Sequence, residues 1–349
     1  TPLYSSAASD VYKRQGRALV SQRIRVRNGD EACNVFWERG WTDGLPIIAP
    51  TEDKVTAFLD NANLEPDQVI GEAPERNRVF TAEKVAINAV MAGCLPEYMP
   101  VIVAVVQAMT APEYMFNHLA SLGSPWPMIY VSGPVVKQLK INAGSYLFGT
   151  EDRANATIGR AISLLLRNCA EAKRGGLQAG QWGNVMRGGG CVVGENEEVV
   201  PWTSLRVQLG FPKDKSAVFV MSTMYPPSMV WCSNLHPERI LDAVSEGLSS
   251  LGFRRSIYVL LVPPNIAEIF HHNGWSKDNI RDHLMATCKR SIACLKRMTR
   301  WGQDAPGFSG FAGDPNVQKV EPGDEEKYVY LFRQNPEYDH ILYLSLIHI

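Results

Sequence analysis

The stretch PMIYVSGP, at residues 127–134, decides the class of fold. Its β-branched and aromatic residues form a short apolar run that a Gly-Pro pair ends, which predicts a buried strand followed by a turn. A helical pattern follows at residues 151–172, where apolar side chains recur three and four positions apart and acidic residues lie at the start. Strands that alternate with helices of this length indicate an α/β fold that includes parallel strands.

The same alternation continues on both sides of this strand. Further helices and strands are predicted at residues 81–93, 96–109, 216–223, 256–265 and 327–334. We therefore expect a helix-rich α/β domain at residues 16–180 and a second α/β domain at residues 181–343, with a partly parallel sheet. The boundary falls in the glycine-rich stretch near residues 175–200.

Both ends of the chain are expected to be foreign to the protein. Residues 1–15, which include SSAASDVYKRQ, and residues 344–349, LSLIHI, resemble translated sequencing-adapter sequence at the ends of metagenomic reading frames. A strand that begins at residue 339 is then cut short, so we expect the C-terminus to be truncated.

Composition and motifs disfavour several classes of protein. The net charge is −1 and basic residues are scattered, which argues against nucleic-acid binding. The apolar run at residues 99–109 is shorter than the roughly 18 residues that a membrane span needs. Seven cysteines without a CxxC pair favour free thiols in the cytoplasm. Phosphate-loop, dinucleotide-binding, zincin and α/β-hydrolase motifs are absent, and the sequence identifies no cofactor.

Cys94 is the first candidate for chemistry. It stands in MAGCLPEYMP, between a predicted helix stop at Gly93 and a predicted helix start at Pro96. The partial positive charge of a helix N-terminus favours a thiolate, so Cys94 is interpreted as a nucleophile or redox thiol. The alternative is a small apolar residue that fills the junction of two buried helices.

The second candidate is the stretch GGGCVVGENEEVVPW at residues 188–202. In a strand, Glu195 and Glu197 would share one face, where two carboxyl groups could serve as general acid and base or hold a cation. Asn196 would lie on the opposite face and is assigned to substrate binding. The alternative is an exposed acidic turn.

A third group of candidates lies at the start of the helix at residues 151–172. Arg153, Asn155 and Asn142 are assigned to substrate binding, because a helix N-terminus offers free N–H groups and an arginine can clamp a carboxylate. Simple helix capping is the competing interpretation. Asp43, in the turn TDGLP, is a further candidate for substrate binding, although an Asp-Gly pair is first of all a turn signal.

Five blocks of the sequence resemble a bacterial family associated with the UGSC-motif (seleno)protein group. They are WTDGLPIIAPTEDKV, TAEKVAINAVMAGCLPEYMPVIVAVVQA, RANATIGRAISLLLRN, GENEEVVPW and GWSKDNIRDHL. The resemblance covers most of residues 40–290. The group takes its name from a Sec/Cys-Gly-Ser-Cys motif, which this chain lacks, so the resemblance implies a companion or partner subunit rather than the redox protein itself.

We therefore expect an α/β enzyme, or a subunit of one, that acts on a small molecule by thiol, redox or acid–base chemistry. Its site gathers Cys94, Arg153, Asn155, Glu195 and Glu197, and the substrate is anionic if Arg153 binds it. No metal site is assigned, and a partner protein or a second copy of the chain is the expected partner. The alternatives are a non-catalytic scaffold, and a metal-dependent hydrolase or lyase that uses the acidic residues as ligands.

Overall fold

The computed structural model describes most of the chain. The described residues are 18–121, 123–149, 151–178, 180, 183–189, 191–224, 229–230, 232, 235–250, 258–298, 318–331 and 343–346. The adapter-like residues 1–15 lie outside them. Contacts between residues divide the chain into two compact units, Thr1–Glu195 with Phe211–Pro227, and Asn196–Gly210 with Ser228–Ile349.

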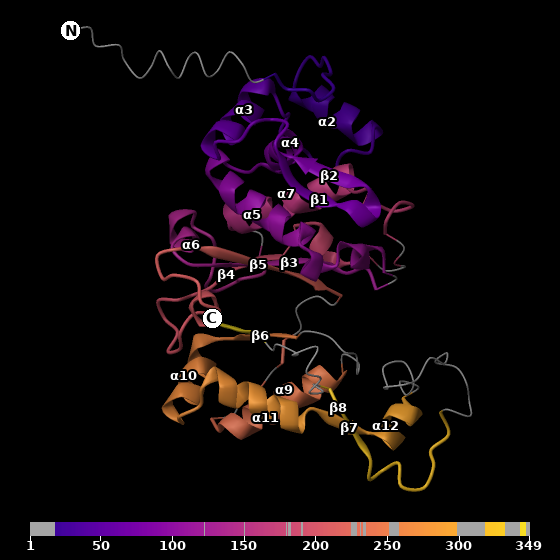
Figure 1. Cartoon of the computed structure of the whole chain (residues 1–349), viewed down its shortest axis with the longest axis vertical. Helices are drawn as coiled ribbons and strands as arrows, with labels where there is room; N and C mark the ends of the chain where they lie inside the picture. The colour runs from indigo at the N-terminus through magenta and orange to yellow at the C-terminus, as the bar shows by residue number, and fades with distance from the viewer. Residues whose placement is uncertain are drawn as a thin grey trace, which may run out of the picture. The chain divides into compact units, whose positions relative to one another are not determined.

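The first unit combines helices with two sheets (Figure 1). Its helices are α2 (Gly29–Glu38), α3 (Glu52–Asn61), α4 (Ala82–Ala92), α5 (Met99–Thr110), α6 (Val135–Gln138) and α7 (Arg153–Cys169). Its strands are β1 (Val69–Ala73), β2 (Arg78–Thr81), β3 (Trp126–Ser132), β4 (Cys191–Gly194) and β5 (Ala217–Thr223). Short 3₁₀ turns stand at Pro74–Arg76, Pro96–Tyr98, Pro112–Tyr114, Phe116–Ala120 and Val185–Arg187.

A three-stranded mixed sheet of order β4-β3-β5 is the larger of the two sheets of this unit. β3 and β4 are parallel, with Val131 opposite Gly194, and β5 runs antiparallel to β3. The chain between the parallel strands includes α7, which packs against β4, as a parallel connection requires. Every residue of β3 is buried, which explains why the run reads as continuously apolar. The predicted α/β class with a partly parallel sheet is confirmed.

The helices α4, α5 and α7 gather on one side of this sheet (Figure 1). α4 ends at Gly93, whose φ of 90° is the left-handed conformation that glycine adopts without strain. Among the described residues no single helix is long and apolar enough to cross a membrane, and the segments Pro96–Thr110 and Pro112–Ala120 reach that length only as a pair bent by 71°.

The division between the units differs from the boundary predicted between residues 180 and 181. β4 and β5 both pair with β3, so the glycine-rich stretch and residues 211–227 belong to the first unit. The first unit is therefore longer than the predicted first domain, because β4 and β5 follow residue 180 in the sequence. Pairing between strands far apart in sequence leaves no mark in local composition.

The second unit has its own apolar core, which includes Leu241, Phe270, Ile280 and Leu284. Its helices are α8 (Leu205–Gln208), α9 (Pro237–Ser250), α10 (Pro264–His272), α11 (Lys277–Thr287) and α12 (Ile292–Arg297). Its strands are β6 (Val259–Val262), β7 (Lys289–Ser291), β8 (Tyr328–Tyr330) and β9 (Tyr343–Leu346), and β6 pairs with β9 in parallel while β7 pairs with β8 antiparallel. Residues 344–346 of the expected adapter-like tail thus form part of a strand.

Candidate functional site

Two of the predicted site residues, Arg153 and Asn155, lie on opposite faces of α7. One turn of an α-helix takes about 3.6 residues, so Arg153, Thr157 and Arg160 follow one face and Asn155 points the opposite way. The first face meets the corner after α4, and the second meets Asn142 and β4. The residues that the sequence assigned to one site therefore lie in separate parts of the structure.

Cys94 closes the C-terminus of α4. The N–H of Gly93 donates to the carbonyl of Val90 at 3.0 Å and the N–H of Cys94 donates to the carbonyl of Ala89 at 3.1 Å. These two bonds make a Schellman motif. Arg153 donates from Nε and Nη2 to the carbonyl of Gly93, at 3.2 and 3.0 Å. Its guanidinium thus caps this corner, and the assignment of Arg153 to an anionic substrate has no geometric support.

The thiol of Cys94 is held in its neutral form. Burial raises the pKa of Cys94 to about 12, although a hydrogen bond with Thr157 and the charges of Arg153 and Arg160 oppose the shift. The partial charge of a nearby helix N-terminus does not outweigh the loss of solvation. This geometry favours the second interpretation, in which Cys94 is a small apolar residue where two buried helices meet.

Asp43 forms an ion pair with Arg160 on the same side of α7. Arg160 donates to both carboxylate oxygens, at 2.8 and 2.9 Å, and also to the carbonyl of Pro46 at 2.9 Å. The Asp43 side chain also accepts from the N–H of Leu45, as in an Asx turn. Both carboxylate oxygens of Asp43 are hydrogen-bonded within the protein. We therefore interpret Asp43 as a turn residue and not as a substrate-binding residue.

The Asp43–Arg160 pair predicts a measurable dependence of stability on pH. Burial by itself would raise the pKa of Asp43, but the Arg160 hydrogen bonds and charge outweigh it and the pKa is lowered. Such a carboxyl stabilises the fold above its unfolded pKa of about 3.9, and this contribution disappears as the pH falls through the folded pKa. We expect Asp43→Asn to cost about 2 kcal/mol at pH 7 and to flatten the loss of stability between about pH 5 and pH 3. Urea unfolding at a series of pH values measures both, and equal pH slopes in the two proteins would contradict the prediction.

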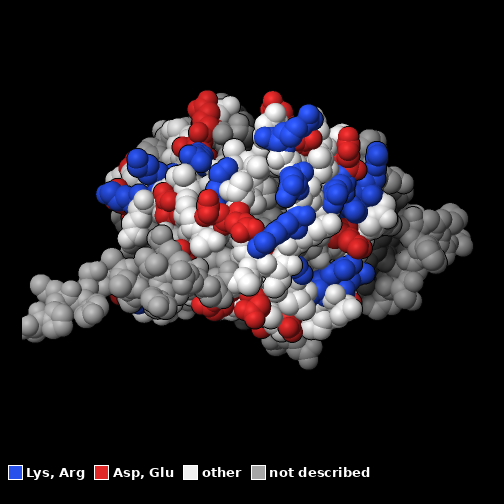
Figure 2. All heavy atoms as spheres, turned by 90° about the horizontal axis from the view of Figure 1, so that it is seen from above, with Lys and Arg blue, Asp and Glu red and all other residues white. Residues whose placement is uncertain are grey.

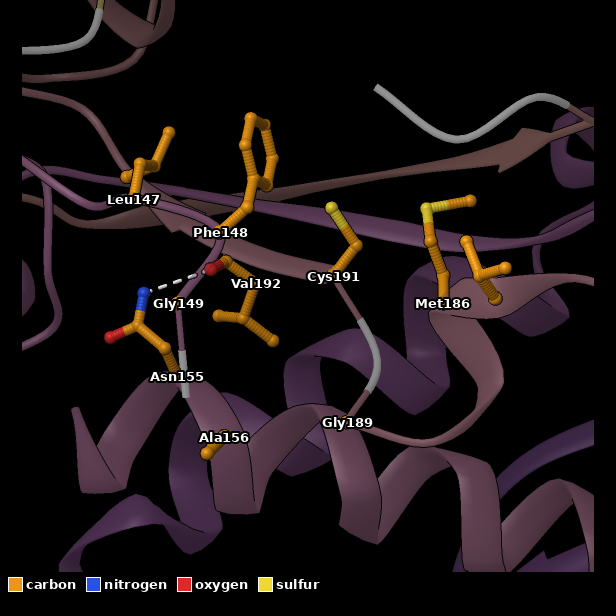
Figure 3. A pocket seen from close by; sticks show the side chains of 10 residues that line it. Leu147, Phe148, Gly149, Asn155, Ala156, Met186, Gly189, Cys191 and Val192 are labelled. Atoms are coloured by element: carbon orange, nitrogen blue, oxygen red, sulfur yellow. Dashed lines mark hydrogen bonds between the residues drawn. The ribbon is translucent and has the colours of Figure 1, made fainter. Parts of the chain in front are cut away.

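On the other face of α7, the amide of Asn155 ties a loop to the sheet. Its Oδ1 accepts from the N–H of Asn142 at 2.7 Å, and its Nδ2 donates to the carbonyl of Asn142 at 3.2 Å. Nδ2 also donates to the carbonyl of Val192 at 2.8 Å (Figure 3). The carbonyl of Asn142 also accepts from the N–H of Gly194 at 3.0 Å. Asn155 is 4% exposed and both its donors are used, so it positions the loop and has no free N–H for a substrate.

Glu195 lies directly after β4 and is 2% exposed. Its carboxylate accepts a hydrogen bond from the hydroxyl of Ser132, at the end of β3, and its N–H donates to the carbonyl of Val131 at 2.8 Å. β3 and β4 are parallel, so Ser132 and Glu195 mark their carboxyl edge. In α/β proteins this edge is where ligands bind.

The expectation that Glu195 and Glu197 share one face of a strand is wrong. β4 ends at Gly194, and residues 197–199 form a turn. Glu197 makes a bidentate ion pair with Arg206, at 2.7 and 2.8 Å, within the second unit, to which Asn196 also belongs. In the described part of the chain, no three His, Cys, Asp or Glu side chains are grouped so that they could hold a metal ion.

A cavity of about 180 Å³ lies beside the first turn of α7. Two segments that the sequence singled out separately enclose it, namely the loop before α7 and the glycine-rich stretch before β4. Most of its lining side chains are apolar, among them Leu147, Phe148, Ala156, Met186, Cys191 and Val192, although polar atoms contribute nearly half of its exposed wall (Figure 3). Neither a charged side chain nor an imidazole belongs to the described lining.

Cys191 is the thiol of this cavity, and sequence reasoning did not assign it a role. It is 4% exposed, and its side chain points away from α7, as do those of Phe148 and Met186 (Figure 3). Burial raises the pKa of Cys191 to about 12, so the thiol is protonated at neutral pH. The sequence signal that could have pointed to Cys191 is its position directly after three glycines, because residues without a side chain leave room for a ligand beside it.

The other hollow and the charged side chains of the surface give weaker evidence for a site. A second hollow, of about 470 Å³, lies between the β1–β2 turn and the end of α7, where Arg78 and Glu171 pair at 3.0 Å. On the face shown in Figure 2, basic and acidic side chains are interspersed, and the described residues form no continuous basic stripe there. The cavity beside α7 is therefore the stronger candidate site.

Comparison of the chain with protein-family models, with curated proteins and with solved structures finds no match. The fold and the site define an α/β protein with a small cavity between the loop before α7 and the start of β4. The case for a function therefore rests on this geometry.

Proposed function

We propose that this chain is an α/β enzyme, or the substrate-binding subunit of one, that takes a small, mostly apolar molecule into the cavity beside α7. The observation that carries the proposal is the convergence of residues 147–149, 185–186, 189 and 191–192 on the first turn of a 17-residue helix. Asn155 in that turn is bonded to Asn142, which in turn accepts from the end of β4. Asn155, which lines the cavity, is thus connected through Asn142 to the end of β4, directly before Glu195.

The size and the wall of the cavity favour a ring about as large as phenol. Its volume of about 180 Å³ is close to that of an apolar cavity of about 150 Å³ that admits benzene. The sulfur atoms of Met186 and Cys191 offer favourable contacts to an aromatic ligand. A neutral molecule suits this wall better than the anionic substrate expected from the sequence, because Arg153 and Arg160 are bonded to their own chain.

Two groups offer chemistry, one at the carboxyl edge of β3 and β4 and one in the cavity wall. Glu195 stands at the carboxyl edge as the candidate general acid or base. Cys191 lines the cavity itself, and its protonated thiol becomes a nucleophile only when a bound molecule or ion removes the proton. Acid–base chemistry by Glu195 is therefore favoured over thiolate chemistry, which first requires that Cys191 lose its proton. The free cysteines suit a reducing compartment such as the cytoplasm.

A role as partner subunit is the second candidate, and one observation favours it. Tyr146, Phe148 and Val185, close to the cavity or in its wall, are 70%, 51% and 80% exposed. Exposed apolar side chains that lie together mark surfaces for other proteins or for ligands. This role agrees with the companion subunit that the resemblance to the UGSC-associated family implies, and a second copy of the chain is an equally suitable partner.

Filling the cavity tests the proposed function. Ala156→Leu enlarges a side chain of the cavity wall, and Ala57→Leu makes the same change at an exposed position of α3. We expect 4-fluorophenol, followed by ¹⁹F NMR, to bind the wild-type protein and Ala57→Leu alike, and to bind Ala156→Leu at least about tenfold more weakly, a difference of about 1.4 kcal/mol. Equal binding to all three proteins would show that the probe binds elsewhere and would overturn the proposal.

A further inference from the structure

We infer that the hollow between the β1–β2 turn and the end of α7 binds a small zwitterion of the α-amino acid class. The hollow measures about 470 Å³, and its described lining carries two glutamates and two arginines, Glu75, Arg76, Arg78 and Glu171. No residue of that lining belongs to the cavity beside the first turn of α7. Most of the helix, roughly 20 Å along its axis, separates the two places. The inference therefore goes beyond the proposed function and does not depend on it.

One wall of the hollow is the turn that joins β1 to β2. The two strands pair antiparallel, with Ala73 opposite Arg78. The N–H of Asn77 donates to the carbonyl of Pro74 at 3.0 Å, and Asn77 has a left-handed backbone with a φ of 51°, which asparagine tolerates better than most residues. The turn thus holds Arg76 and Arg78 in the lining of the same hollow.

The other wall is the chain that leaves α7. The carbonyl of Glu171 accepts from the N–H groups of Lys173 and Leu177, at 2.7 and 2.9 Å. A Cβ at position 176 would lie 2.5 Å from this carbonyl oxygen, so the close return of the chain requires Gly176. Backbone contacts therefore build this wall before any ligand binds, and preorganised groups bind at a lower entropic cost.

An ion pair joins the two walls. Nη2 of Arg78 lies 3.0 Å from Oε2 of Glu171, and the two side chains are 34% and 59% exposed. The pair uses one nitrogen of a guanidinium that has five N–H donors, and one of two carboxylate oxygens. Because both side chains are open to solvent, a molecule in the hollow can reach the remaining donors and the second oxygen.

The charges of the lining favour a zwitterion over a simple anion or cation. Two arginines and two glutamates cancel, so an ion of either sign is repelled by half of them. A carboxylate fits the planar fork of Arg76 or Arg78, which can donate two parallel N–H groups. An ammonium group fits Glu171, because this residue follows the C-terminus of α7, where the partial charge of the helix is negative. An α-amino acid carries both groups on one carbon atom, and Pro74 and Leu177 offer contacts to its side chain.

Binding of L-leucine, and of two analogues with one charged group each, tests the inference. 4-Methylpentanoate lacks the ammonium group of leucine, and isopentylamine lacks its carboxylate. In ligand-observed NMR titrations of the wild-type protein, we expect L-leucine to bind at least about tenfold more tightly than either analogue. Equal affinity for L-leucine and one of the analogues would show a site for a single charge. That result, or absence of leucine binding, would overturn the inference.

Substitutions on each wall test the role of each charge. We expect Arg76→Gln and Glu171→Gln to weaken leucine binding at least about tenfold. Glu171→Gln should also strengthen the binding of 4-methylpentanoate, because Arg78 loses its partner, and a misfolded wall would not show this gain. Arg174 is exposed and lies outside the described lining, so Arg174→Gln is the matched control and should change leucine affinity less than about twofold. Wild-type affinity in Arg76→Gln or Glu171→Gln, or an equal loss in the control, would overturn the inference.

A last comparison separates this inference from the proposed function. Ala156→Leu, which fills the cavity beside α7, should bind L-leucine as the wild-type protein does. Loss of leucine binding in Ala156→Leu, with normal binding in Arg76→Gln, would place leucine in that cavity and overturn this inference alone. Leucine binding that depends on Arg76 and Glu171, in a protein that ignores 4-fluorophenol, would support the hollow and overturn the proposed function alone.

Discussion

Asn155→Asp is expected to lower the free energy of unfolding by at least about 3 kcal/mol at pH 7. The amide of Asn155 donates to the carbonyls of Asn142 and Val192 and is buried. An aspartate has the same shape but no donor, so a charged oxygen would face two carbonyl oxygens without solvent. Urea unfolding followed by circular dichroism measures the loss.

Asn61→Asp is the matched control for this change. Asn61 is exposed at the end of α3, so the substitution should alter stability by no more than about 0.5 kcal/mol. We also expect Asn155→Asp to weaken the binding of 4-fluorophenol, because the loop before α7 loses its tie to β4. A cost as small as that of the control would show that these hydrogen bonds do not hold the site together.

Gly71→Ala should destabilise the protein by about 3 kcal/mol, at the upper end of the range for overpacked sites. A Cβ at this position of β1 would lie 2.2 Å from Oγ1 and 3.0 Å from Cβ of Thr110. Rotation of the threonine side chain moves Oγ1 but not its Cβ, so β1 and the end of α5 have to separate. Thermal unfolding of the variant measures the cost.

Two further variants show whether the clash is the cause. Thr110→Ala removes Oγ1 and Cγ2, and we expect Gly71→Ala/Thr110→Ala to recover at least about 1 kcal/mol relative to the sum of the single changes. Gly29→Ala, where an added Cβ meets nothing within 4 Å, should cost far less than Gly71→Ala. Strict additivity in the double variant would place the cause elsewhere.

The local elements of this protein were determined by the sequence itself. PMIYVSGP predicted the buried strand β3, and Gly93 predicted the end of α4. Each of these features depends on residues within one or two turns of the chain. The α/β class followed from their order.

Which candidates meet was decided by the tertiary structure alone. Asp43 finds Arg160 across 117 positions and Asn155 finds β4 across 37, while Glu195 and Glu197, two positions apart, serve different units. Residue type shows that a side chain needs a partner, but the partner is chosen by how strands and helices pack. Cys94 stays protonated because packing buries its thiol, and Cys191 lines the cavity because residues 147–149 pack beside the start of β4.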